Sequence, residues 1–96
     1  MTGLARVLDD VLTVVTTTEQ DTSWTRRWDT ADEMVRELSD HRDRVRLGDL
    51  STLPELKFLF APTGPLQDVS LSSGWGELFL RLAERFDGAY AEIMDS

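Results

Sequence analysis

The sequence contains no cysteine, which excludes disulfide bonds, thiolate metal ligands and thiol nucleophiles. This absence fits a reducing compartment, so we expect a cytoplasmic protein. No apolar run approaches the roughly 20 residues that a membrane-spanning helix needs. The first ten residues also lack the basic segment and apolar run of a secretory signal. The sequence therefore predicts neither export nor membrane insertion.

Basic residues are scarce: ten stand against 18 acidic ones, which gives a formal net charge of −8. A surface of this charge repels phosphates and anionic lipid head groups, so we expect neither a nucleic-acid nor a membrane partner. The acids are unevenly placed, with four acids and no base between Arg6 and Arg26 and three acids and no base after Arg85. Such stretches favour a basic protein partner. Nine of the ten bases are arginine, which is typical of a GC-rich bacterial genome.

The overall composition, with 41% hydrophobic and 29% charged residues, is that of a folded globular protein. Because 96 residues are too few for two separate cores, we expect a single domain spanning residues 1–96.

Two N-terminal segments show the periodicity of amphipathic helices. Apolar residues repeat at helical spacing through residues 4–15. A second helix is predicted to begin at Thr30, which forms a capping box with Glu33, and to end at Gly48. Within its apolar stripe stands Arg42, which we expect to lay its stem over apolar surface or to pair with a buried acid.

The C-terminal half is predicted to combine a β-hairpin with a third helix. Apolar residues alternate around Phe58 and again at residues 69–71, on either side of a turn with two prolines, so residues 56–72 resemble a hairpin. Residues 72–74 then supply the N-cap of a helix whose apolar face runs from Trp75 to Ile93. Leu80 points away from that face and is a candidate for partner contact. The predicted fold class is α+β: two N-terminal helices, a β-hairpin and a C-terminal helix packed as one small two-layer domain.

The only histidine, His41, shares a helical strip with Glu37 and Glu33. Divalent metals are held by such residues. We expect the strip to be exposed, however, and neither a second histidine nor a cysteine completes a ligand set. No nucleophile elbow or phosphate-binding loop accompanies it either. The sequence thus predicts no catalytic site, no metal site and no cofactor.

Trp24 and Trp28 stand one helical turn apart beside Arg26 and Arg27, in the only basic and aromatic cluster of the chain. Such a cluster can stack on bases or clamp a peptide, but the size of the domain favours core packing for both tryptophans.

Residues 59–71, which read LFAPTGPLQDVSL, resemble a segment of the form LFGGMGSFNDLVL found in an uncharacterised family of small bacterial proteins. Upstream, the two tryptophans, Gly48-Asp49 and Leu53 also fall at positions typical of that family. This chain departs from the pattern by carrying Ala61-Pro62 in place of two glycines and Gln67 in place of asparagine. The resemblance implies a small α+β protein of bacterial origin and no particular reaction. Asp68 keeps its family position, where it either caps turn amides or, with Gln67, contacts a ligand.

The sequence therefore favours a noncatalytic, acidic protein-interaction module that neutralises or regulates a basic partner, in the manner of an immunity protein. The alternative is a small-ligand-binding or regulatory domain. Its pocket would lie between the hairpin and the last helix, lined by Asp68, Gln67, Arg42 and Trp75. An enzyme is the class with least support.

Overall fold

A computed structural model describes residues 3–23, 25–62 and 64–95. These residues form five α-helices and no β-strand, so the predicted α+β class is wrong and the described chain is all-helical. The helices are α1 (Gly3–Thr17), α2 (Ala31–Arg46), α3 (Leu53–Leu59), α4 (Pro65–Ser73) and α5 (Gly76–Asp95).

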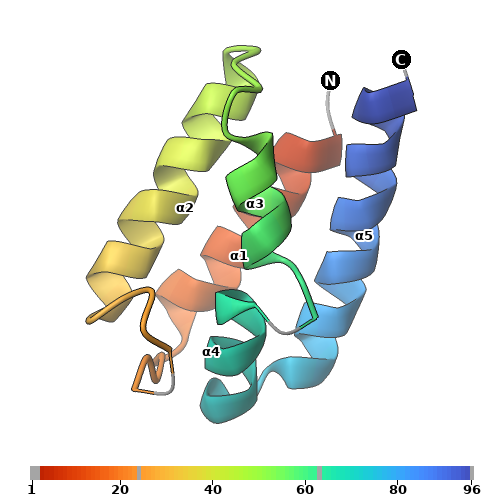
Figure 1. Ribbon diagram of the computed structural model, residues 1–96. Helices are drawn as coiled ribbons and strands as arrows, with labels where there is room; N and C mark the ends of the chain where they lie inside the picture. Colours follow the sequence, from red (N-terminus) through yellow and green to blue (C-terminus); the bar gives the residue numbers. More distant parts are fainter. Residues whose placement is uncertain (1–2, 24, 63, 96) are drawn as a thin grey trace.

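The first helix is the centre of the arrangement, because α1 packs against both α2 and α5 (Figure 1). The short α3 lies in front of α1 in this view, between the two long helices, and α4 packs against α5 at one end of the molecule. Two contacts anchor α3 to its neighbours. Thr52, just before α3, meets His41 of α2, and Phe60, just after α3, stacks on Phe86 of α5.

The predicted hairpin is replaced by α3 and α4, and the reason lies in which apolar residues are buried. Leu53, Leu56 and Leu59 are buried at a spacing of three, which is helical, whereas Phe58 is 55% exposed. The alternation of apolar residues around Phe58 therefore did not reflect a strand with one buried face. Each helix also has a proline in its first turn, where the missing N–H costs no hydrogen bond.

The boundary before the last helix also differs from the prediction. Residues 72–74 do not cap α5; instead Gly74, with a φ of 87°, ends α4 in the left-handed conformation. The Trp75 N–H donates to the Ser70 carbonyl oxygen at 2.9 Å, and α5 then begins at Gly76.

The N-terminal helices follow the prediction closely. The apolar stripe of residues 4–15 is buried in α1, apart from the half-buried Val14. Thr30 is the N-cap of α2, and its Oγ1 accepts a hydrogen bond from the Glu33 N–H at 3.3 Å. All five helices contribute to one continuous core of buried apolar side chains. None of the described helices has the length and apolar character that crossing a membrane requires.

The linker between α1 and α2 is hydrogen-bonded to residues 72–75, where α4 ends and α5 begins. The Asp21 N–H donates to Ser73 Oγ at 2.8 Å, and Ser72 Oγ donates to the Asp21 carbonyl oxygen at 2.9 Å. Trp75 Nε1 donates to Gln20 Oε1 at 2.8 Å. These bonds hold the linker against the junction of α4 and α5.

Candidate functional site

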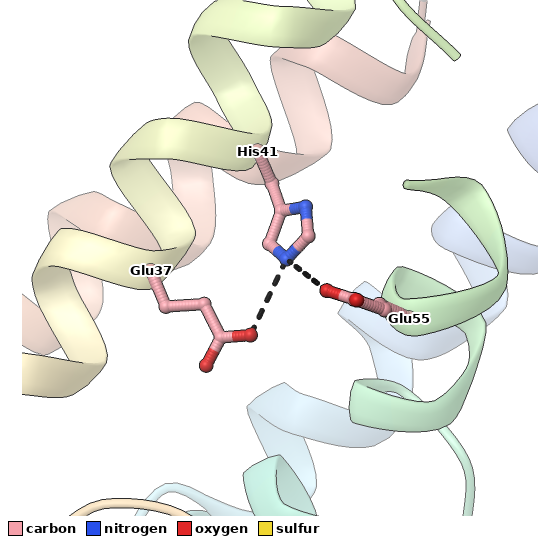
Figure 2. Close-up of side chains that lie close together, drawn as sticks. All are labelled: Glu37, His41 and Glu55. Carbon is pink, nitrogen blue, oxygen red and sulfur yellow. Dashed lines mark hydrogen bonds and ion pairs between the residues drawn. The ribbon is translucent and has the colours of Figure 1, made fainter. Parts of the chain in front are cut away.

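Among the described residues, three side chains that could ligate a metal ion, Glu37, His41 and Glu55, lie together between α2 and α3 (Figure 2). The His41 imidazole projects from α2 toward α3 and is only 2% exposed. Its Nδ1 lies 3.0 Å from Thr52 Oγ1. Its Nε2 faces two carboxylates, with Glu37 Oε2 at 3.4 Å and Glu55 Oε2 at 3.9 Å.

These side chains are brought together by two short-range features of the chain. Glu37 and His41 are four residues apart on α2 and therefore share a face of that helix. Glu55 lies in the first turn of α3, and the loop before α3 turns back at Gly48, where φ is 81°. Asp49 stabilises this loop because its Oδ1 accepts hydrogen bonds from the Ser51 N–H at 3.0 Å and Ser51 Oγ at 2.7 Å.

Glu37 is the most highly bonded carboxylate of the cluster. Arg27 forms a bidentate ion pair with it, in which Nε lies 3.0 Å from Oε1 and Nη2 contacts Oε2. The buried Trp28 donates its Nε1–H to the same Oε1 at 2.8 Å. Burial alone raises the pKa of Glu37, but the hydrogen bonds from Arg27, Trp28 and His41 outweigh it, and its pKa lies below the usual range. Glu37 is therefore held ionised beside the imidazole.

The cluster corrects the prediction of an exposed strip. His41 is buried, and the third member of the cluster is Glu55. Glu33 does not belong to the cluster, and its carboxylate accepts a hydrogen bond from the Asp29 N–H at 2.9 Å. Neither Glu55 nor Thr52 was recognised from the sequence, because their position depends on α3, most of which was predicted as the first strand of the hairpin. An expectation of a helix over residues 53–59 would have placed Glu55 in its first turn.

A second feature is an open, mostly apolar groove of about 770 Å³ between α4 and the start of α5. Gln67 and Leu71 line it from α4, and Trp75 and Leu80 line it from the following segment and α5. Leu71 and Leu80 are both well exposed, the latter at 58%. Gln67 Oε1 is buried and has no hydrogen-bond partner among the described residues. This region therefore combines exposed apolar surface with an unsatisfied acceptor.

The structure brings together only part of the predicted pocket. Gln67, Trp75 and Leu80 line the same groove, but its second wall is α4 and not a hairpin. Asp68 lies instead in a separate hollow with Thr25, Arg26, Arg27, Phe58 and Pro65. Arg42 lies on α2, where it pairs with Asp9 of α1 at 3.4 Å.

Of the two tryptophans predicted to contact a partner, the structure describes Trp28. Trp28 is buried in the core, with its indole N–H donated to Glu37, so it does not offer a free stacking surface. Trp24 lies outside the described residues.

No protein-family model matches the chain, and neither the curated proteins nor the solved structures compared with it give a match.

Proposed function

We propose that the protein is a noncatalytic interaction module that binds a basic amphipathic helix of another protein in the groove between α4 and α5. The observation that carries this proposal is the exposed apolar surface of that groove, formed by Leu71, Leu78 and Leu80. Exposed apolar side chains that gather in one groove are typical of helix-binding surfaces.

The charge of α5 defines the partner. This helix carries five acids and two arginines, of which Glu77 and Arg81 line the groove, and the other arginine, Arg85, pairs with Asp10 of α1 at 2.7 Å. Glu84 and Asp87 follow the groove on the next turns of α5. A bound helix with apolar residues on one face and lysine or arginine on the other would place its charges beside the α5 carboxylates. Gln67 Oε1 has no hydrogen-bond partner among the described residues, and a turn of this buried side chain toward the groove would let it accept from a donor on the bound helix.

A designed leucine–lysine amphipathic peptide tests the proposal, with a leucine–glutamate peptide of the same pattern as the charge control. We expect the basic peptide to bind, its affinity to fall as salt is raised, and its amide shift changes in NMR spectra to map to α4 and the first half of α5. Equal binding of both peptides, or shifts that map to another face, would contradict the proposal.

Leu80→Ser is the matching variant, and Leu47→Ser is its control because Leu47 is also highly exposed but lies at the C-terminus of α2. Both changes should leave the free energy of unfolding within about 0.5 kcal/mol of the original value, as is usual for surface substitutions. Only Leu80→Ser should weaken peptide binding, by about tenfold, which corresponds to about 1.4 kcal/mol.

A further inference from the structure

We propose that Glu37, His41 and Glu55 form a binding site for one divalent transition-metal ion, with zinc as the ion that their donor atoms fit. This site is separate from the groove between α4 and α5, so either proposal can fail without the other.

The first argument is the convergence of donor atoms. One ligand atom from each of the three side chains lies within 4.8 Å of the others. In a tetrahedral zinc site with bonds of about 2.0–2.2 Å, neighbouring ligand atoms are about 3.3–3.6 Å apart. The 3.4 Å between His41 Nε2 and Glu37 Oε2 already matches this edge, and the 3.9 Å to Glu55 Oε2 requires only a small movement. The Glu55 side chain is 61% exposed and is free to make that movement.

The second argument is the support behind the histidine. Thr52 Oγ1 lies 3.0 Å from Nδ1, which leaves Nε2 as the nitrogen that faces both carboxylates. In the metal-free protein Nε2 donates its proton to Glu37, and a metal ion between the two carboxylates would take the place of that proton. The ring proton would then lie on Nδ1 and be donated to the threonine oxygen. Metal-bound histidines commonly donate their other ring N–H to an oxygen in this way.

The third argument concerns Glu37, which has partners on both of its oxygens. Oε1 accepts from Trp28 Nε1 and Arg27 Nε, and these two bonds fix the carboxylate from the side away from His41. Oε2 contacts both Arg27 Nη2 and His41 Nε2. A metal ion on Oε2 would replace the Nη2 contact and leave the Oε1 bonds in place as outer support.

The donor set also selects the ion. One imidazole nitrogen with carboxylate oxygens suits zinc and its first-row neighbours, whereas calcium takes six to eight oxygen ligands. Three protein ligands leave the fourth tetrahedral position for water on the exposed Glu55 side. Binding would join α2 to α3, so the metal should also raise the melting temperature of the domain.

Titration calorimetry with zinc chloride on the full chain, previously dialysed against a chelator, tests the proposal. We expect one equivalent of zinc to bind and to raise the melting temperature. Glu55→Gln should weaken binding by about tenfold or more, while folding is maintained because Glu55 is exposed. Glu84→Gln is the control, since it removes an exposed carboxylate of α5 and the same unit of charge. It should bind zinc like the original protein.

Imidazole nitrogen NMR provides a second readout that identifies the ligand atom. Zinc should shift the His41 Nε2 resonance strongly and the Nδ1 resonance weakly, because Nδ1 is turned toward Thr52. The proposal is overturned if zinc does not bind saturably, if Glu84→Gln weakens binding as much as Glu55→Gln, or if the His41 nitrogens do not respond.

Discussion

His41 Nδ1 lies 3.0 Å from Thr52 Oγ1, and this contact joins α2 to the residue that precedes α3. Thr52 occupies the N-cap position of α3, yet its side chain makes no capping hydrogen bond there. Its hydroxyl instead orients a buried imidazole, so the usual role of an N-cap threonine is given up for a contact between two helices.

Thr52→Val tests the stabilising effect of this contact in metal-free buffer. The change keeps the shape of the side chain but leaves the buried Nδ1 without a partner, so we expect the free energy of unfolding to fall by about 1–3 kcal/mol. Thr13→Val removes an exposed hydroxyl bonded to the Asp9 carbonyl oxygen and should cost less than about 0.5 kcal/mol. Urea unfolding measures the free energy of unfolding of both variants, and equal losses would contradict a stabilising role of the Thr52 contact.

Phe60 and Phe86 stack with their ring centroids 4.3 Å apart and their planes within 1° of parallel. Because both rings are buried, replacing either by alanine should cost about 3–5 kcal/mol. A double-mutant cycle with leucine at each position should give a coupling energy of about 0.5–1.5 kcal/mol. Strictly additive effects in denaturant unfolding would mean that the stacking contributes nothing beyond burial.

Two glycines should respond to alanine in opposite directions. A Cβ at Gly64 would meet the Phe58 carbonyl oxygen and approach the carbonyl oxygens of Leu59 and Ala61 at 3.1 Å. These are backbone atoms, so Gly64→Ala should lower the melting temperature by several degrees. At Gly88, inside α5, a Cβ has open space. Gly88→Ala should therefore stabilise the protein by about 0.8–1 kcal/mol through helix propensity, and thermal unfolding measures both effects.

Asp49 should contribute to the acid sensitivity of the protein. Hydrogen bonds from Ser51, with a smaller effect of Arg44, hold the pKa of Asp49 below its usual range. Its charged form therefore stabilises the folded state above the pKa of the unfolded chain, and this stabilisation is lost as the pH falls through the lower, folded pKa. The stability difference between the original protein and Asp49→Asn should shrink from pH 7 to about pH 3. Asp87→Asn, at an exposed position of α5, is the control and should show a smaller change in that difference.

The sequence predicted the long helices because their stripes are unambiguous. Residues 4–15 and the capping box at Thr30 carry local signals, and α1 and α2 follow them. Short segments carry weaker signals: a seven-residue helix such as α3 spans two turns, and the apolar residues of such a segment fit a period of two nearly as well as one of 3.6. Pro54 and Pro65 each lie in the first turn of a helix, but Pro65 was interpreted as part of the turn between two strands, and the position of Pro54 was not used in the prediction.

The candidate site was harder to predict than the helices because it depends on the pairing of segments. His41 was placed on an exposed strip because it shares one side of the helix with Glu33 and Glu37 and arginines flank that strip. Only the packing of α3 against α2 buries the imidazole and adds Glu55 and Thr52 to it. The exposure of Leu80, by contrast, follows from its angle on α5 and was predicted correctly.

The bonds from Gln20 and Asp21 to residues 72–75 join positions 51 to 55 apart in the chain. Such distant partners meet only after a long stretch of backbone has been ordered, and the entropy of closing that loop delays them. The first linker should thus dock late in folding, after the helices have assembled. Substitutions there should accelerate unfolding and leave the folding rate nearly constant.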